Sequence, residues 1–255
     1  MATNTVENYL KSIFHLSAGQ SGKVPTTRIA EHLGVKSSTV TDMIQKLKER
    51  QLVAYTKYQG VTLTAQGKAL ALDIVRKHRL WEVFLVEKLG FKWDEVHSIA
   101  EQLEHIQSSE LVNRLDDFLD NPTQDPHGDP IPDRDGSFKK LSQQLMVTLQ
   151  AGDTATVSRV TEDDPSLLHF LDTQGLRLNA SFEVKQIIDF DGTLIIEVAD
   201  HTVSVSQKIA NYIYVVKKWG HYPDSFTKSI TPNHNQLLFL LCCHILRYCF
   251  LYRRL

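Results

Sequence analysis

The sequence predicts two parts of different fold class, a mainly α-helical region followed by a small all-β region. Before residue 120 the apolar residues recur at helical spacing, whereas after residue 140 they alternate in short runs. Four of the eight prolines lie between these parts, in NPTQDPHGDPIPDRDG, and predict a linker over residues 121–140. With 255 residues, 42% hydrophobic and 23% charged, the composition is that of a globular protein and excludes disordered and collagen-like chains.

The first 64 residues are predicted to form three helices and a hairpin. The first helix begins near Thr5 and ends before AGQSGKVP, where two glycines and a proline interrupt the pattern. TTRIAEHLGV predicts a second helix capped by Thr26 or Thr27, and KSSTVTDMIQKLKERQLV predicts a third capped by Ser37 or Ser38. In LVAYTKYQGVTLT, β-forming residues flank QG, which predicts a small hairpin. Together these elements describe a winged helix-turn-helix.

A winged helix-turn-helix places the second helix of the turn motif in the major groove of DNA. Residues 1–88 carry 13 Lys and Arg against 7 Asp and Glu, a balance that suits a polyanionic partner. The polar and basic side chains expected to contact DNA are Thr26, Lys36, Ser37, Ser38, Thr39, Thr41, Gln45, Lys46, Lys57 and Tyr58. Hydroxyls and amides can reach base edges or phosphates, and lysines supply the salt-dependent part of the affinity. The alternative is that the hydroxyls only cap helices and the lysines are ordinary surface charge.

Residues 65–120 are predicted to form three further helices. A long helix runs from a cap at Thr64 to Gly90. VHSIAEQLEHI belongs to a second helix that begins near Asp94, and SSELVNRLDDFLD predicts the third.

Potential metal ligands share one face of the middle helix of this region. At about 100° per residue, four side chains fall within an arc of roughly 100°. These are His97, Glu101, Glu104 and His105. On the preceding long helix, His78 and Glu82 are spaced i, i+4 and can meet one cation. Residues 89–140 hold 5 Lys and Arg against 12 Asp and Glu, which suits a cation, although the simpler interpretation of the face is a solvated charged surface.

After the linker, the spacing of two predicts strands. TATVSRV, SFEVKQII, GTLIIEVA, HTVSVS and YIYVVKK are the runs, and five short strands within 141–220 suggest a small barrel. Between the first two runs, DPSLLHFLDTQG predicts a helix capped by Asp164. The tail over 221–255 has an apolar run, Leu237 to Tyr252, that is shorter than the ~20 residues that span a bilayer. A partner-binding helix, an interfacial helix and an end without function stay open for this tail.

Cysteine usage and the N-terminal residues predict a cytoplasmic setting. The three cysteines all lie in the last fourteen residues, so no disulfide framework supports the body of the protein. MATNTVENYL lacks the basic and apolar regions of a signal peptide. We therefore expect a reducing compartment and no membrane partner.

Several of these segments together resemble the diphtheria toxin repressor family of metal-dependent regulators, with its iron-dependent and manganese-dependent branches. The segments are VENYLKSIF, RIAEHLGVKSSTVTDMIQKLKERQLV, VTLTAQGKALALDIVRKHRLWEVFLVEKLG, VHSIAEQLEH and PHGDPIP. The resemblance covers residues 3–135. The later β-rich part is similar to the SH3-like C-terminal domain of that family, which resembles FeoA.

The resemblance implies a set of metal ligands. A primary site would use Asn8, Glu101, Glu104 and His105. A second site would use His78, Glu82, His97 and Asp163. At the position of Glu101 the iron branch has a cysteine and the manganese branch a glutamate, and a carboxylate favours Mn²⁺ or Fe²⁺. The manganese branch has acidic residues at the positions of Asn8 and Lys11, and a lysine ammonium repels a second cation. We expect one or two sites, with manganese ahead of ferrous iron.

The resemblance also implies a function. It predicts a homodimeric repressor, not an enzyme, that binds a palindromic DNA operator when metal is bound and controls metal-homeostasis genes. The dimer contact would use apolar residues of the last helix, for which the internal core is the alternative. These are Leu111, Val112, Leu115 and Phe118.

Two other functions are compatible with parts of the sequence. A metal-dependent hydrolase also uses His and Glu clusters, but the sequence has no HExxH signature and no nucleophile elbow. A helix-turn-helix regulator could instead receive a non-metal signal through its C-terminal domain, and its DNA binding would then be indifferent to chelators.

Overall fold

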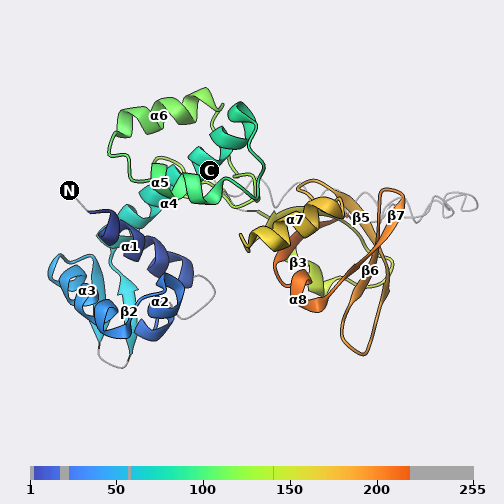
Figure 1. The fold of residues 1–255 in the computed structure, drawn as a ribbon, viewed down its shortest axis with the longest axis horizontal. Helices are drawn as coiled ribbons and strands as arrows, with labels where there is room; N and C mark the ends of the chain where they lie inside the picture. The colour runs from blue at the N-terminus through green and yellow to red at the C-terminus, as the bar shows by residue number, and fades with distance from the viewer. Residues whose placement is uncertain (1–2, 18–22, 57–58, 140, 219–255) are drawn as a thin grey trace, which may run out of the picture. The chain divides into compact units, whose positions relative to one another are not determined.

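A computed structural model of the chain describes residues 3–17, 23–56, 59–139 and 141–218. In these ranges, helices dominate up to residue 118 and strands dominate from residue 144 (Figure 1). The first elements are α1 (Asn4–Ser17), α2 (Thr26–Leu33), α3 (Ser37–Glu49), β1 (Val53–Thr56), β2 (Gly60–Leu63), α4 (Ala65–Leu89), α5 (His97–Leu103) and α6 (Ser109–Phe118). The predicted fold class, mainly α and then mostly β, is confirmed. The predicted wing residues Lys57 and Tyr58 and the tail over 221–255 lie outside the described residues.

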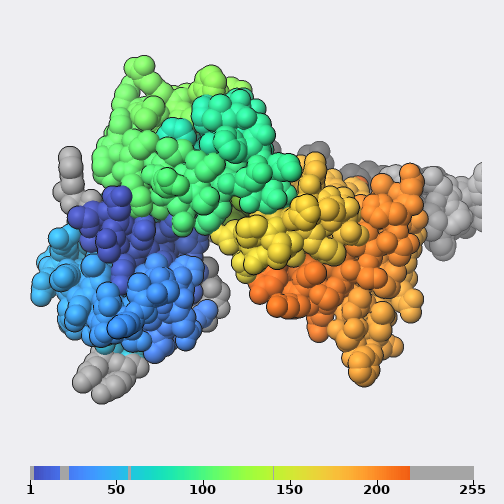
Figure 2. All heavy atoms as spheres, viewed as in Figure 1, coloured from blue at the N-terminus to red at the C-terminus, as the bar shows by residue number. Residues whose placement is uncertain are grey.

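The first three helices and the hairpin pack around one apolar core. Its fully buried members include Leu10 of α1, Ile29 of α2, Ile44 of α3 and Val61 of β2. Gly34, in the turn between α2 and α3, has the left-handed conformation with φ 63°, which ends α2 sharply. Val40, Ile44 and Leu47 turn the apolar face of α3 into this core. The opposite face of α3 lies on the surface of the molecule (Figure 2).

Two of the predicted helix caps are wrong and two are confirmed. Pro25 and Lys36 take the extended cap conformation before α2 and α3, and neither makes a side-chain cap hydrogen bond. The residues predicted as caps lie instead in the first turns, and they are Thr26, Thr27, Ser37 and Ser38. Thr64 does cap α4, because its side chain accepts from the Gly67 N–H, and Asp164 caps the helix that follows it.

The helices α4, α5 and α6 form the second helical part. α4 is 25 residues long, and α6 packs on it through a core that includes Leu80, Val83, Val112 and Leu115. None of the helices in the described ranges combines the length and apolarity that a membrane crossing requires.

α5 is shorter than the sequence predicts. It begins at His97 instead of near Asp94 and ends at Leu103, so that Glu104 is its C-cap and His105 follows it. A tight turn ends the helix, because the Ile106 N–H donates to the Leu103 carbonyl. Glu104 still has helical backbone angles, and its N–H donates to the Ala100 carbonyl, whereas His105 lies in the turn that follows.

The proline-rich stretch predicted as a linker packs against α4. Its side chains Asp125, His127 and Ile131 are buried. The Arg79 guanidinium of α4 donates to the Pro130 carbonyl, and Gln124 and Pro130 form an isolated antiparallel bridge. These contacts fix the PHGDP segment beside α4.

The β part is one antiparallel sheet in the order β3-β8-β4-β5-β6-β7. Its elements are β3 (Gln144–Leu145), β4 (Thr154–Val160), α7 (Pro165–Thr173), β5 (Ser181–Ile187), β6 (Leu194–Val198), β7 (His201–Val205), α8 (Gln207–Ala210) and β8 (Ile213–Lys218). The five predicted strands are all present, whereas β3 and α8 were not predicted. Register shifts at Val157/Arg159 and Val184/Gln186 bend β4 and β5 around an apolar core.

Replacing Gly67 with alanine should weaken the junction between the hairpin and α4. A Cβ atom on Gly67 would lie 1.9 Å from the Leu52 carbonyl oxygen, a backbone atom that cannot rotate away. We expect the free energy of unfolding to fall by about 1–3 kcal/mol in Gly67→Ala, as for other overpacked sites. Urea unfolding followed by circular dichroism measures this change. The matched control is Lys68→Ala at the next, exposed position, and equal stabilities of the two variants would contradict the close approach.

Candidate metal centre

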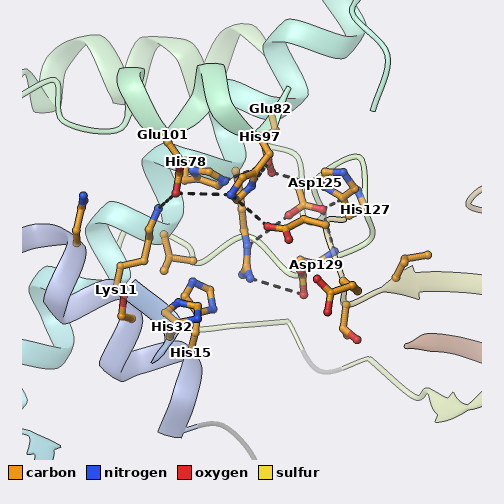
Figure 3. A pocket seen from close by; sticks show the side chains of 18 of the residues that line it. Lys11, His15, His32, His78, Glu82, His97, Glu101, Asp125, His127 and Asp129 are labelled. Carbon is orange, nitrogen blue, oxygen red and sulfur yellow. Dashed lines mark hydrogen bonds and ion pairs between the residues drawn. The ribbon is translucent and has the colours of Figure 1, made fainter. Parts of the chain in front are cut away.

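One face of α4 brings a histidine and a glutamate toward α5. His78 and Glu82 lie one turn apart on α4, and both are buried. The His78 Nε2 atom lies 3.0 Å from Glu82 Oε1, and His97 Nδ1 at the start of α5 lies 3.5 Å from the same oxygen (Figure 3). One donor atom of each residue lies within 4.8 Å of the others. The predicted group of His78, Glu82 and His97 is therefore close enough to contact a single ion.

A second group of three donors shares Glu82 with the first. It adds Asp125 and His127 from the proline-rich stretch, and its donor atoms also lie within 4.8 Å of one another. Asp125 Oδ1 accepts from the backbone N–H groups of His127 and Asp129, at 2.8 and 3.0 Å, which fixes the turn. His127 Nδ1 lies 3.8 Å from Glu82 Oε2. Sequence reasoning missed Asp125 and His127, although their signal was the acidic residue and histidine within DPHGD.

Both groups line a cavity of about 540 Å³. α1 contributes Asn8 and Lys11 to its wall, and the segment after β4 contributes Asp163. The Asp163 Oδ2 atom lies 3.1 Å from His97 Nε2, so this predicted ligand does reach the first group. Glu101 of α5 is half exposed at the same cavity, 3.6 Å from His97 Nε2.

The buried carboxylates hold protons on two histidines. Burial disfavours a charged ring, but Glu82 and Glu104 outweigh this effect and raise the pKa of His78 to about 9. Burial likewise opposes protonation of His127, yet Glu82 and Asp125 raise its pKa to about 9. Near pH 7 both rings are therefore imidazolium ions, and the protons supply the positive charge that Glu82 requires.

The Asp125 carboxyl is buried near two other carboxylates and lies 3.4 Å from the Arg79 Nε atom. Burial, followed by the charges of Glu82 and Asp129, raises its pKa to about 7, although Arg79 and His127 oppose this rise. A buried carboxyl that holds its proton near neutral pH indicates a corner of the cavity that would gain from a cation.

Hydrogen bonds on the far side of two rings assign which nitrogen faces the cluster. His127 Nε2 lies 2.8 Å from the Trp93 carbonyl oxygen, which can only accept, so Nε2 carries the proton and Nδ1 faces Glu82. His78 Nδ1 lies 2.6 Å from Glu104 Oε2, and its Nε2 faces Glu82. Once an ion displaces the proton on the inner nitrogen, each ring would present that nitrogen to the ion and keep its outer N–H on an acceptor, as metal-binding histidines do.

In the other predicted ligand set, Glu101 and Glu104 both lie against the Lys11 ammonium. Glu104 lies against Lys11 and His78, while His105 Nδ1 lies 2.6 Å from Glu7 Oε2. His105 Nε2 is 3.9 Å from Glu104 Oε1. Sequence reasoning missed Glu7, a buried acidic residue on α1 next to Asn8. The donors that do gather are carboxylate oxygens and imidazole nitrogens, a set that suits Mn²⁺ and Fe²⁺.

The side chains predicted to contact DNA are mostly on the surface. Those that are exposed are Lys36, Ser37, Ser38, Thr39, Gln45 and Lys46. Thr26 and Thr41 are half-buried, and the Thr41 hydroxyl donates to the Ser37 carbonyl.

The predicted dimer residues divide into two pairs. Val112 and Leu115 are buried in the core between α4 and α6, so the alternative of internal packing holds for them. Leu111 and Phe118 are exposed by 42% and 61%. Phe118 also lies beside Phe84 of α4, with ring centroids 6.4 Å apart.

Comparison with known proteins assigns each part of the chain to a family. Residues 1–61 match the N-terminal DNA binding domain of iron dependent repressors, residues 64–133 match their metal binding and dimerisation domain, and residues 145–217 match the FeoA domain.

Whole proteins and solved structures agree with this assignment. The iron-dependent repressor of Mycobacterium leprae is 32% identical over 228 residues, 84% of this chain and 97% of that protein. The diphtheria toxin repressor of Corynebacterium efficiens is 29% identical over 85% of this chain and 97% of its own length. A manganese-dependent transcriptional repressor in complex with manganese is 38% identical, with a TM-score of 0.77 over 84% of this chain and 100% of that chain. ScaR with bound Cd²⁺ is 36% identical, with a TM-score of 0.71 over 84% and 99%. The chain therefore belongs to the diphtheria toxin repressor family of metal-dependent transcriptional repressors.

Proposed function

We propose that this chain represses transcription as a homodimer on a palindromic operator when Mn²⁺ or Fe²⁺ occupies a centre built around Glu82. The observation that carries the proposal is that two groups of three donors share this one buried carboxylate. The residues proposed as ligands are His78, Glu82, His97, Asp125 and His127, with Asp163 at the edge of the centre. We expect the genes under control to serve metal homeostasis.

The charge of the cavity supports a divalent cation at this centre. In its absence, protonated His78 and His127 neutralise Glu82, and burial together with Glu82 and Asp129 raises the pKa of Asp125 to about 7. A bound ion supplies the same positive charge at one point and releases those protons. Oxygen and imidazole donors favour Mn²⁺ or Fe²⁺ over thiophilic metals, and we place manganese first.

The centre lies where three segments meet, which supports a role in control of DNA binding. Its ligands come from α4, from the start of α5 and from the PHGDP segment, and α4 continues directly from the hairpin of the DNA-binding part. A ligand shifts a conformational equilibrium only as far as it binds one arrangement more tightly. Ligands on separate segments provide this difference, because all of them approach one point only in one arrangement of the segments.

Two exposed surfaces support DNA and a second copy of the chain as partners. They are the outer face of α3 and the apolar residues of α6. Ser37, Ser38 and Lys46 are available to bases or phosphates in the major groove. Leu111 and Phe118 are exposed apolar side chains of α6. They lie in the region that matches the metal binding and dimerisation domain of the family. We propose this face as the contact between the two copies, which would set the distance between the two α3 helices.

Replacing Glu82 with glutamine should abolish the response to metal. The amide keeps the shape of the side chain but removes the charge that both donor groups share. We expect the affinity for Mn²⁺ to fall at least about hundredfold, because outer acceptors alone contribute 10–100-fold, and operator binding to become insensitive to Mn²⁺. Calorimetry and an anaerobic mobility-shift titration measure the two effects.

The matched control for this variant is Glu87→Gln, at an exposed position of the same helix. It should behave as the unaltered protein does. A Glu82→Gln protein whose operator binding still requires Mn²⁺ would remove this centre from the sensor role.

Metal affinity should rise with pH. His78 and His127 both have a pKa of about 9, so at pH 7 the ion competes with a proton on each ring. Raising the pH toward 9 removes this competition, and each displaced proton gives about a tenfold gain in affinity per pH unit. Mn²⁺ titrations between pH 6.5 and 8 in non-coordinating buffers test the sign. An affinity that does not change over this range would show that these histidines keep their protons when the ion binds.

Replacing Lys46 with alanine should weaken operator binding and leave metal affinity intact. Loss of one phosphate contact should reduce the slope of log affinity against log salt concentration by about 1. The control is Lys208→Ala, an exposed lysine of the β part, which should not change the slope. If Lys46→Ala lowered Mn²⁺ affinity and left DNA affinity unchanged, the assignment of the two parts would be reversed.

A further inference from the structure

Lys11, in the wall of the cavity, places a positive charge between Glu101 and the fully buried Glu104. Its side chain extends from α1 and is only 12% exposed. The Nζ atom lies 2.7 and 2.8 Å from the two carboxylate oxygens of Glu104. It lies 3.5 Å from Glu101 Oε1 (Figure 3). Three carboxylate oxygens from two residues therefore surround one ammonium group.

We propose that Lys11 is a tethered cation that takes the place of a second metal ion, joining α1 to the end of α5 and restricting metal binding to the centre around Glu82. This inference rests on the proposed function, because it assumes that the Glu82 centre binds the regulatory metal. In this inference, Glu101 and Glu104 bind the Lys11 ammonium instead of a metal ion.

The burial of Glu104 shows why a cation is required there. The residue is 0% exposed, and a buried carboxylate without compensating charge is strongly destabilising. The groups that face it are the Lys11 ammonium, the His78 ring at 2.6 Å and the His105 ring at 3.9 Å. An ion bound to Glu104 would lie within a few ångströms of the ammonium and would be repelled by it.

Glu104 in turn positions a ligand of the Glu82 centre. It accepts from His78 Nδ1, and this contact turns His78 Nε2 toward Glu82, 3.0 Å away. Lys11, Glu104 and His78 thus form a line of contacts from the first helix of the DNA-binding part to the metal centre. In this line Lys11 and Glu104 are positioning residues, and His78 is the ligand.

A second pair of contacts makes the same connection without metal. Glu7, also on α1, lies 2.6 Å from His105 Nδ1 and accepts from the Gln107 side chain at 2.8 Å. α1 is therefore held to the end of α5 and the segment after it by the Lys11–Glu104 ion pair and by the hydrogen bonds of Glu7. A metal ion would therefore bind on the other side of the cavity, where it would join His97 and the PHGDP segment to α4.

The number of Mn²⁺ ions bound per chain tests this inference. Equilibrium dialysis of the full chain, followed by elemental analysis, should give one additional ion per chain in Lys11→Ala, because Glu101, Glu104 and Asn8 are then free to bind it. Lys11→Arg keeps the positive charge and should bind as many ions as the unaltered protein. Lys92→Ala, at an exposed position away from the cavity, is the control for loss of a lysine.

Combination with Glu82→Gln separates failure of this inference from failure of the proposed function. At an Mn²⁺ concentration that just saturates the unaltered protein, Glu82→Gln alone should bind no ion, and the Lys11→Ala, Glu82→Gln double variant should bind one. Metal binding that persists in Glu82→Gln and disappears in Glu104→Gln would overturn both. If Glu82→Gln abolishes binding and Lys11→Ala, folded by circular dichroism, binds no additional ion, Lys11 does not occupy a metal position and only this inference fails.

Discussion

The Glu82 carboxylate is the charge on which the cavity depends. It is 2% exposed, and the rings of His78, His97 and His127 approach it from α4, α5 and the proline-rich stretch. A charge at this depth is tolerated only when positive charge meets it. The three segments therefore keep their places in part because each brings a histidine to this carboxylate, and the same approach makes the cluster suitable for a divalent ion.

The cavity meets its need for positive charge in two different ways. Around Glu82 the compensating groups are histidines, whose protons a metal ion can displace, so this charge can respond to metal concentration. Around Glu104 the compensating group is the Lys11 ammonium, which is part of the chain and is always present. The first arrangement is suited to a sensor, and the second is suited to a permanent connection between α1 and α5.

The sequence by itself determined those features whose signals lie within a few residues of one another. The helical spacing of apolar residues placed the helices, the Thr64 and Asp164 side chains marked two of their starts, and alternation placed five strands. The i, i+4 spacing of His78 and Glu82 predicted that both lie on one face of the long helix, and in the structure their side chains are in contact on α4. The sequence patterns of segments within residues 3–135 were enough to identify the family, because that resemblance does not depend on knowing which distant residues are in contact.

Only the tertiary structure decided which side chains meet across long stretches of chain. Lys11 and Glu104 are 93 residues apart, and neither residue's neighbours in the sequence indicate the pair. Asp125 and His127 lie among prolines that predict a linker, and their burial follows from contacts with α4. The end of α5 places His105 in a turn, where its ring meets Glu7 of α1, a contact that local periodicity does not predict. Local propensity sets the elements within one or two turns, whereas packing and charge compensation between elements select the members of the site.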